Sequence, residues 1–216
     1  MIPLIRVHDV NYGLVERTDL GEMADLLASV FSRFDPPAIA AGLSFDDVRE
    51  LVRHYGQRVP DDALTVIARS QPSGKLIGAM LTDDFADPPP KHLEGLLAGN
   101  FKSIGAILEK LDGQYRKIRQ VHPGTILHLF MLGVDPAFGG KGIARNLVQV
   151  TLENGRQKGY QRAVTEATGR VSQHIFRSHG FEELFRVPYQ EFIFDGERPF
   201  SVIVDHEAIV LLERAL

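Results

Sequence analysis

The sequence of 216 residues contains no cysteine. This absence excludes disulfide bonds, thiolate nucleophiles and zinc sites with cysteine ligands. No apolar run approaches the roughly 20 residues that a membrane span needs. The first 13 residues also lack a basic region followed by a long apolar core, so a secretory signal is not expected. We therefore expect a cytoplasmic protein with no membrane partner.

An excess of basic residues is also missing, because the formal net charge is −4. Nucleic-acid-binding proteins usually carry a basic patch, so no nucleic-acid partner is expected. The eight histidines show no spacing typical of metal ligands, and we predict no metal. We expect residues 1–216 to form a single domain, with the proline-rich stretch 83–92 as a surface loop, and a homodimer is possible.

Hydrophobic periodicity predicts a mixture of helices and strands. The expected helices are 20–31, one beginning after Ser44, about 93–118, 143–158 and 172–178. The expected strands are 10–15, 64–68, 76–81, 125–134, 163–166, 181–187, 190–194 and 208–212. The proline-bearing segment 34–43 is expected to be a loop. The pattern predicts an α/β fold in which helices cover a sheet.

The stretch GVDPAFGGKGIARNLV, residues 133–148, joins a predicted strand to a predicted helix through three glycines and a lysine. The free N–H groups and positive dipole end of a helix N-terminus favour anions, and glycines let the backbone approach phosphate oxygens. A nucleotide-binding P-loop is excluded because Lys141 is followed by Gly142. The dinucleotide fingerprint is excluded because Arg145 stands where it needs Gly or Ala. A flexible turn without a ligand is the remaining structural alternative.

The same stretch resembles the pyrophosphate loop of the GNAT acetyltransferase superfamily, through Leu132-x-Val134-x-Pro136 followed by Gly142-x-Ala144. The resemblance implies a central mixed, mostly antiparallel sheet flanked by helices, a bulged strand before the loop, and acetyl-CoA as co-substrate. The family pattern has Gln or Arg at the position of Gly139. This sequence therefore lacks that side chain but keeps the backbone amides of the loop. The implied cofactor-binding residues are Leu132, Val134, Gly139, Gly140, Lys141, Gly142, Ile143 and Ala144.

Three further segments resemble the insect-type arylalkylamine N-acetyltransferases: FSRFDPPAI at 31–39, FRSHGFEELFRVPYQEF at 176–192 and HEAIVLLERAL at 206–216. This resemblance implies that the acceptor is the primary amine of a small molecule, an arylalkylamine or a polyamine. It places Asp35 where the group has its catalytic glutamate. It also matches Ser172 to a serine near the cofactor thiol. Phe176 stands where many family members have a tyrosine acid, and it cannot donate a proton.

Acyl transfer to an amine requires a base that removes the amine proton. His128 lies on the strand that precedes the glycine loop, and its ordinary pKa of about 6.5 suits this task. Asp35 is the second candidate and needs a raised pKa. We prefer His128 as the base. For each candidate a purely structural role is an equally good interpretation: His128 as a strand residue bonded to the backbone, and Asp35 as the cap of a turn. Ser172 is the third candidate catalytic residue, with a helix-capping role as its alternative.

These observations predict an acetyl-CoA-dependent N-acetyltransferase that acts on a small amine by direct attack, without a covalent enzyme intermediate. Two alternatives stay open at this point. One is an idle acyl-CoA-binding sensor or interaction module, because Gly139 and Phe176 depart from the catalytic pattern. The other is a peptide N-terminal acetyltransferase, which needs an open groove.

Overall fold

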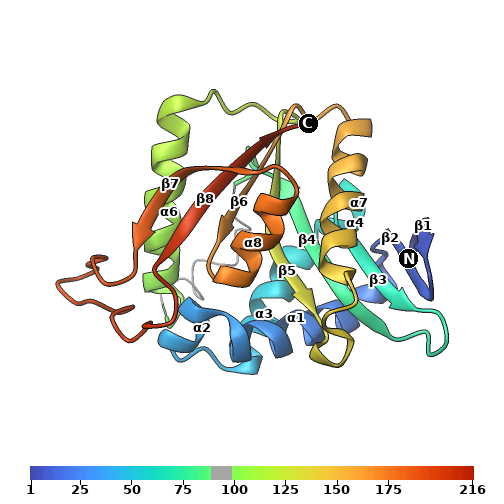
Figure 1. Cartoon of the computed structure of the whole chain (residues 1–216), viewed down its shortest axis with the longest axis horizontal. Helices are drawn as coiled ribbons and strands as arrows, with labels where there is room; N and C mark the ends of the chain where they lie inside the picture. Colours follow the sequence, from blue (N-terminus) through green and yellow to red (C-terminus); the bar gives the residue numbers. More distant parts are fainter. Residues whose placement is uncertain (89–98) are drawn as a thin grey trace.

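A computed structural model describes residues 1–88 and 99–216. In this part of the chain, one eight-stranded sheet runs across the molecule in the order β1-β2-β3-β4-β5-β6-β8-β7 (Figure 1). All neighbouring strands are antiparallel except β5 and β6. The strands are β1 (Ile2–Val7), β2 (Val10–Leu14), β3 (Val66–Ser70), β4 (Leu76–Asp84), β5 (Ile126–Val134), β6 (Arg162–Ala167), β7 (Glu182–Pro188) and β8 (Ala208–Ala215). The predicted mixed, mostly antiparallel sheet is confirmed.

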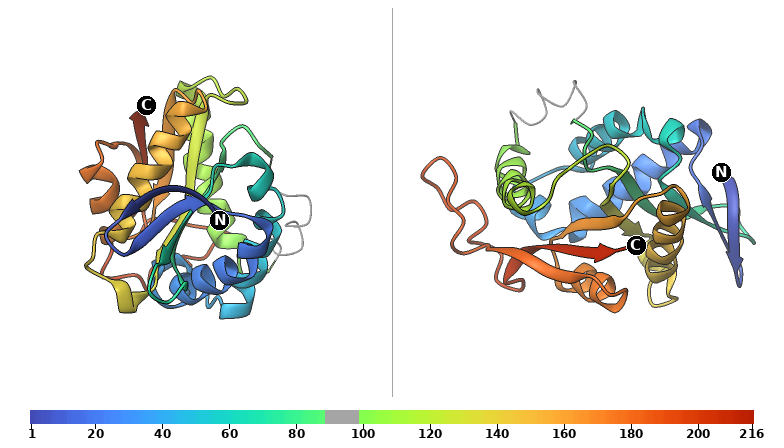
Figure 2. Two further views of the ribbon diagram at one scale, coloured as in Figure 1. Left: turned by 90° about the vertical axis from the view of Figure 1, so that its right-hand side faces the viewer. Right: turned by 90° about the horizontal axis from the view of Figure 1, so that it is seen from above.

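Helices cover both faces of this sheet (Figure 2). They are α1 (Leu20–Phe34), α2 (Pro36–Ala40), α3 (Phe45–Gly56), α4 (Val59–Asp62), α6 (Lys102–Ile118), α7 (Ile143–Gln157) and α8 (Arg170–Ser178), with 3-10 turns η1 (Arg17–Asp19) and η3 (Pro136–Phe138). The helices α7 and α8 pack on one face, and α1, α3 and α6 pack on the other. In the described ranges, no helix has both the length and the apolar character needed to cross a bilayer.

The helix α7 lies close to the sheet because two glycines lack side chains at the contact. A Cβ on Gly155 would lie 2.6 Å from Cδ2 of Leu127, and one on Gly78 would lie 2.9 Å from Cδ1 of Leu147. Packed interiors do not tolerate such overlaps. These glycines therefore fix the position of α7, and with it the place of its N-terminus beside β5.

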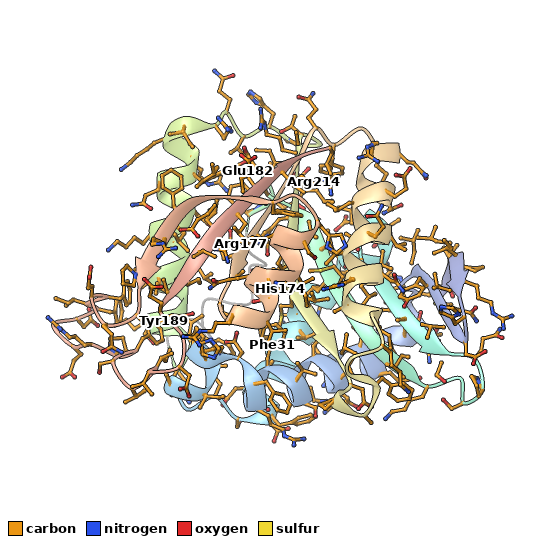
Figure 3. All side chains as sticks on the ribbon, viewed as in Figure 1. Phe31, His174, Arg177, Glu182, Tyr189 and Arg214 are labelled. Atoms are coloured by element: carbon orange, nitrogen blue, oxygen red, sulfur yellow. The ribbon has the colours of Figure 1, made fainter. Side chains whose placement is uncertain are left out.

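Local capping starts several helices where the sequence predicts them. Ser44 accepts a hydrogen bond from the N–H of Asp47 over 3.1 Å, and the Asp47 carboxylate bonds back to the Ser44 N–H over 2.8 Å. This reciprocal pair satisfies two N–H groups that the first turn leaves without partners. On the other face, Arg177 of α8 lies beside β7 (Figure 3), where its guanidinium donates to Glu183 over 2.6 Å.

The structure corrects four local predictions. Residues 190–194 do not form a strand, and only an isolated bridge joins Phe194 to Glu197. The apolar pattern arises because this loop buries aromatic rings such as that of Phe192. The predicted loop 34–43 contains α2, because Asp35 caps it and Pro36 begins it. The strand β1 was not predicted, and α8 begins two residues earlier than expected. The predicted helix from about 93 is α6 in its described part, and residues 93–98 lie outside the described residues.

Candidate functional site

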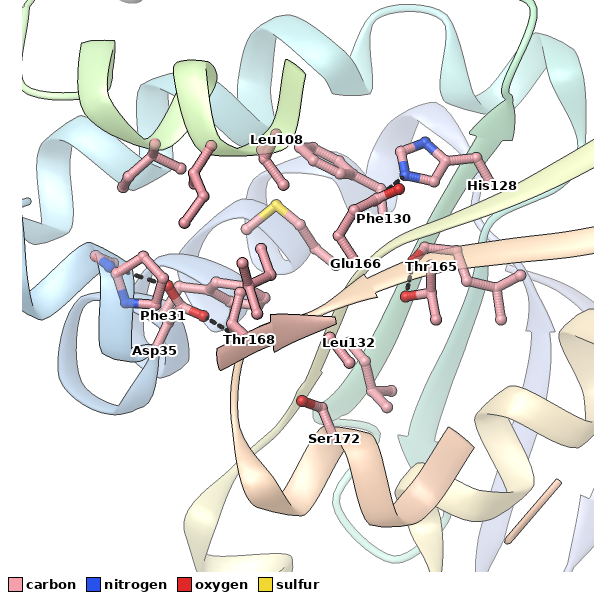
Figure 4. A pocket seen from close by; sticks show the side chains of 18 of the residues that line it. Phe31, Asp35, Leu108, His128, Phe130, Leu132, Thr165, Glu166, Thr168 and Ser172 are labelled. Atoms are coloured by element: carbon pink, nitrogen blue, oxygen red, sulfur yellow. Dashed lines mark hydrogen bonds and ion pairs between the residues drawn. The ribbon is translucent and has the colours of Figure 1, made fainter. Parts of the chain in front are cut away.

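The parallel strands β5 and β6 separate after a short pairing. They pair only from Ile126–Arg162 to His128–Val164, although β5 continues to Val134. At the point of separation, the Thr165 hydroxyl donates to the Leu129 carbonyl over 2.8 Å. This bond gives the carbonyl the partner that a neighbouring strand would otherwise supply. The separation opens a cavity of about 1080 Å³ between the strands and the helices α1, α6 and α8 (Figure 4).

A β-bulge on β5 divides the wall of this cavity. Leu81 of β4 pairs with Met131 and Thr82 pairs with Leu129, so Phe130 is the extra residue. Before the bulge, Leu129 packs in the core under α7, whereas after it Leu132 packs there and Met131 faces α1. A strict alternation would have placed His128 and Leu132 on the same face. The expected bulged strand is confirmed, and the bulge lies at Phe130.

The glycine loop leads directly into α7. Gly140 and Gly142 have φ angles of +74° and +76°, a left-handed conformation that L side chains rarely adopt. Gly142 is the N-cap of α7 and provides no side-chain cap. Within the described part of the chain, the N–H groups of Gly140, Lys141 and Gly142 have no hydrogen-bond acceptor. A row of free N–H groups at the positive end of a helix is an anion site.

The sequence-predicted cofactor residues are divided between the loop and the cavity. Leu132, Val134 and Ala144 line the cavity. The side chain of Ile143 is buried in the core, so only its backbone can face a ligand. Gly139, Gly140, Lys141 and Gly142 are exposed at the surface beyond the cavity. The arrangement suits a long ligand with an anionic part on the loop and a tail that enters between β5 and β6.

Asp35 lies at the junction of α1 and α2 and lines the cavity. Its Oδ2 accepts from the Ala38 N–H over 3.0 Å, and its Oδ1 accepts from the Thr168 hydroxyl over 2.6 Å. Burial raises the pKa of Asp35 to about 6, although both hydrogen bonds favour the carboxylate. Tyr189, labelled in Figure 3, donates to the Thr168 carbonyl over 2.7 Å and thereby holds Thr168 in place. Asp35 therefore caps a helix and is also a carboxyl group poised to exchange a proton near neutrality.

His128 lies on the other side of the cavity from Asp35 in Figure 4. Its Nδ1 is 2.9 Å from Oδ1 of Asp83, and its Nε2 is 2.8 Å from Oε2 of Glu166. Burial disfavours the charged ring, but the carboxylates of Glu166 and Asp83 more than offset this and raise the pKa of His128 well above its ordinary value. Both ring nitrogens face a carboxylate oxygen, an arrangement that favours the charged ring.

A fourth titratable group, Asp112 of α6, completes this cluster. Burial and the charge of Glu166 raise the pKa of Asp112 to about 8, so its carboxyl is largely protonated at pH 7 and shares a hydrogen bond with Glu166. Phe85 and Phe130 contact the His128 ring with centroid separations of 5.5 and 5.4 Å. Apolar rings thus surround the charged groups.

Ser172 lines the cavity from the first turn of α8. Its hydroxyl donates to the Gly169 carbonyl over 2.9 Å and accepts from the Gly169 N–H over 3.3 Å. Ser172 therefore stabilises the helix start from the third helical position rather than from the N-cap. Phe176, one turn later, is only 2% exposed and packs against Phe181.

Several cavity residues were missed in the sequence. His206 was not singled out in the sequence, but it lines the cavity and its Nδ1 accepts from the Arg170 N–H over 3.2 Å. Thr168, Glu166 and Asp112 show no local motif, because their roles depend on partners far away in the chain. The only available signal was their polarity beside predicted buried positions.

No group of three or more histidine, aspartate or glutamate side chains suited to a metal ion occurs among residues 1–88 and 99–216. The expected absence of a metal stays a prediction.

Solved structures with the same fold include a condensation domain and several N-acetyltransferases. The C-terminal condensation domain of Ebony, in complex with beta-alanyl-dopamine, has a TM-score of 0.87 at 16% identity, covering 96% of this chain and 99% of that one. Arylalkylamine N-acetyltransferase 2 from Aedes aegypti has a TM-score of 0.81 at 22% identity, covering 96% and 99%. The Drosophila melanogaster polyamine N-acetyltransferase has a TM-score of 0.71 at 20% identity, covering 96% and 100%.

The sequence itself matches the acetyltransferase (GNAT) family over residues 44–181, more than half of the chain. The match contains the bulged strand, the glycine loop, α7 and all of α8. The chain belongs to the acetyltransferase (GNAT) family and is an acetyl-CoA-dependent acyltransferase.

Proposed function

We propose that the protein transfers an acetyl group from acetyl-CoA to the primary amine of a small molecule, with Asp35 as the base. The observation that carries this proposal is the half-buried Asp35 carboxyl, held by Thr168 and Ala38 on the wall of the cavity. A pKa of about 6 leaves Asp35 ionised at pH 7 and still basic enough to accept a proton.

The reaction is a direct displacement at the thioester. The neutral amine attacks the carbonyl carbon, the new C–N bond forms, and the amine proton passes to the Asp35 carboxylate. The C–S bond then breaks, and the thiolate of CoA takes a proton on leaving. Ser172 is our candidate to relay that proton: its hydroxyl lines the cavity on α8 and would donate to the thiolate while it takes a proton from water, whereas Phe176 has no proton to give.

Acetyl-CoA has a natural place on the glycine loop. The pyrophosphate would bind the N–H groups of Gly140–Ala144, where the helix dipole favours negative charge. Lys141 adds a positive charge beside them, although its Nζ now lies 5.0 Å from the centre of the Phe138 ring. The pantetheine and acetyl group would enter the cavity past Val134 and Leu132.

The contacts of His128 do not support our first preference for it as the direct base. An imidazolium whose two nitrogens are bonded to Asp83 and Glu166 has no lone pair for a proton. The proposal therefore gives His128 a positioning role: it connects β4, β5 and β6 at the place where the strands separate.

Two other functions fit the structure less well. An idle acyl-CoA sensor needs no acid with a raised pKa beside the acyl site, and Asp35 is such an acid. A peptide N-terminal acetyltransferase must leave room for the rest of its peptide, whereas α2 and α6 both contribute walls to this cavity. The small-molecule amine is therefore the proposed acceptor.

The test is release of the CoA thiol from acetyl-CoA over a panel of small amines, amino acids and peptides. We expect turnover of small primary amines that is lost in Asp35→Asn. Asparagine keeps the helix cap, so a folded and inactive variant is expected. Asp25→Asn, an exposed carboxylate on α1 that pairs with Arg49, serves as control. Efficient acetylation of peptide N-termini without turnover of any small amine would overturn the proposal.

A further inference from the structure

The two helices that begin beside the cavity carry basic side chains that the chemistry above does not use. Arg145 lies in the first turn of α7, and Arg170 and His174 lie on α8. Residues four apart on a helix share one face, so Arg170 and His174 project from the same side of α8. These three residues are called the basic cluster below.

Two members of the basic cluster meet across the gap between the helices. A terminal guanidinium nitrogen of Arg145 lies 3.4 Å from Nε2 of His174, which projects from the side of α8 toward α7 (Figure 3). A guanidinium has donors only, so Nε2 is the acceptor in this contact. Both side chains are exposed, and a contact of this length is weak. Arg145 therefore remains available for a stronger acceptor.

The positive charge of the basic cluster is not balanced by acids. Neither helix has an acidic residue in its first turn, and α8 contains none at all. Glu153 is the acid of α7, and it pairs with Arg156 over 2.8 Å near the other end of the helix. Asp135, before the glycine loop, pairs with Lys75 over 2.6 Å. Among the residues that the structure describes, no carboxylate pairs with Arg145 or Arg170.

Arg145 also stands at an unfavourable place in α7. The N-terminus of a helix carries partial positive charge, so its first turn favours acidic residues and disfavours basic ones. Arg145 is the third residue of the helix, close to the free N–H groups of the glycine loop. Sequences break such local rules mostly at functional sites. An anion that contacts both the loop and the guanidinium would remove this repulsion.

The basic cluster lies at the rim of the cavity, beside the path proposed for acetyl-CoA. Each of its members has a sequence neighbour that lines the cavity, namely Ala144, Val171 and Ile175. Its own side chains are on the exposed outer side of these neighbours. The pantetheine would pass the lining residues on its way in. The adenosine end of CoA would therefore emerge next to the basic cluster.

The spacing between the loop and Arg145 suits the phosphate group on the ribose of CoA. Six covalent bonds join the phosphorus on the ribose 5′ oxygen to the phosphorus on the 3′ oxygen, and bond lengths of about 1.5 Å place them about 7 Å apart. Arg145 follows Gly142 by three residues, a rise of about 4.5 Å along the helix. Its side chain extends about 6 Å from Cα. The guanidinium can thus contact a phosphate one ribose away from the loop.

The chemistry of that phosphate matches the basic cluster. A phosphate monoester carries between about 1.5 and 2 negative charges at pH 7, whereas each phosphate of the pyrophosphate bridge carries about one. Arginine binds phosphate oxygens through two parallel hydrogen bonds. A doubly charged group is therefore the part of CoA that an unbalanced cluster of positive side chains should attract most strongly.

We propose that Arg145 and His174, with Arg170 beside them, form a subsite for the 3′-phosphate of CoA. The protein then selects free acetyl-CoA over pantetheine thioesters that lack this phosphate, including those attached to a carrier protein. This proposal rests on the proposed position of the CoA pyrophosphate on the glycine loop. It concerns the acyl donor alone and does not depend on which amine is acetylated.

The test compares the binding of CoA and 3′-dephospho-CoA by calorimetry at low salt. We expect the wild type to prefer CoA by about 10- to 100-fold, the range for a hydrogen bond between charged groups. Arg145→Gln should reduce this preference to about 3-fold or less, and His174→Gln should reduce it as well. Arg145→Lys keeps the charge but loses the paired hydrogen bonds, so it should have an intermediate preference. Arg156→Gln, at the other end of α7, is the matched control and should preserve it.

Two further measurements separate recognition of the 3′-phosphate from a structural role. Arg145→Gln should bind 3′-dephospho-CoA as the wild type does, because the glycine loop stays intact. Without ligand its Tm should be no lower than that of the wild type, because the substitution removes a charge that the helix dipole disfavours. An equal loss of affinity for CoA and 3′-dephospho-CoA would assign Arg145 to the pyrophosphate and overturn the subsite.

Other outcomes would also overturn the subsite. The wild type could bind CoA and 3′-dephospho-CoA equally, or its preference could be unaffected by Arg145→Gln. If CoA binds but no small amine is acetylated, the proposed acceptor fails and the subsite is still tested by these titrations. If CoA itself does not bind, the proposed function fails. Titration with adenosine 3′,5′-bisphosphate and adenosine 5′-monophosphate then decides the subsite: a preference for the bisphosphate that Arg145→Gln abolishes would support it, and no preference would reject it.

Discussion

The Thr168 hydroxyl donates to Oδ1 of Asp35 over 2.6 Å, although 133 residues separate them in the chain. Asp35 comes from the end of α1 and Thr168 is the residue after β6, so the bond joins two parts of the cavity wall that are far apart in the chain. It orients a carboxyl whose pKa burial has raised to about 6. The same bond connects the proposed base to the strand that carries Glu166.

Asp35→Asn should reduce kcat by roughly 10²- to 10⁴-fold, the usual contribution of a positioned base. The loss of stability should be small, because the asparagine Oδ1 still accepts from the Ala38 N–H and its Nδ2 can donate to the Thr168 hydroxyl oxygen. Steady-state kinetics and thermal unfolding, compared with Asp25→Asn, would separate these effects. Wild-type kcat in a folded Asp35→Asn variant would remove Asp35 from the mechanism.

The pH profile of kcat should show an acid limb with an apparent pKa near 6, because protonation of Asp35 removes the base. Activity should therefore fall as the pH decreases through 6 and level off above it. The measurement is kcat at saturating concentrations of both substrates from pH 5 to 9. His128→Gln should retain this limb, and its disappearance in that variant would return the role of base to His128.

His128→Gln should clearly reduce the free energy of unfolding, with a smaller effect on kcat. At pH 6 the imidazolium stabilises the buried carboxylates of Asp83 and Glu166, and its removal should cost roughly 3 kcal/mol. The folded-state pKa of His128 is raised, so this stabilisation is complete below the unfolded value of about 6.5 and is lost as the pH rises through the folded value. Urea unfolding of both proteins at several pH values between 6 and 10 should show the difference shrinking with increasing pH. A constant difference would mean that the histidine is neutral in the folded protein.

Gly142→Asp should weaken acetyl-CoA binding by about 10-fold or more, because it adds a carboxylate and a Cβ at the anion site of α7. Gly74→Asp is a matched control, since Gly74 also has a left-handed φ, +67°, with open space around it, in the turn between β3 and β4. Calorimetric titration of both folded variants tests the loop. Equal affinities for acetyl-CoA would show that the pyrophosphate binds elsewhere.

Ser172→Ala should lower kcat by about 10-fold if its hydroxyl protonates the leaving thiolate. Ser178→Ala is the control, because Ser178 is also on α8 and its hydroxyl bonds only within that region, to the Ile175 carbonyl over 2.7 Å and to His179. Single-turnover kinetics with acetyl-CoA report the chemical step without product release. An unchanged rate for Ser172→Ala would assign the proton to water or another donor.

The sequence by itself determined the parts of this protein that depend on neighbours in the chain. The glycines at 139, 140 and 142 and the strand before them predicted the loop and the start of α7, because a left-handed turn and a helix N-terminus need only local residues. The Ser44–Asp47 capping pair was predicted for the same reason. The family resemblance gave the mixed sheet, the co-substrate and Asp35 as a candidate.

Only the tertiary structure decided the surroundings of the two candidate bases, His128 and Asp35. His128 has an ordinary pKa in isolation, and it became a cation because β4 and β6 place Asp83 and Glu166 on its two nitrogens. Asp35 has a low pKa in isolation, and burial raised it. Desolvation and contacts between distant segments set these values, and a linear sequence contains neither. For this reason residue type favoured His128 as the base, whereas the folded environment favours Asp35.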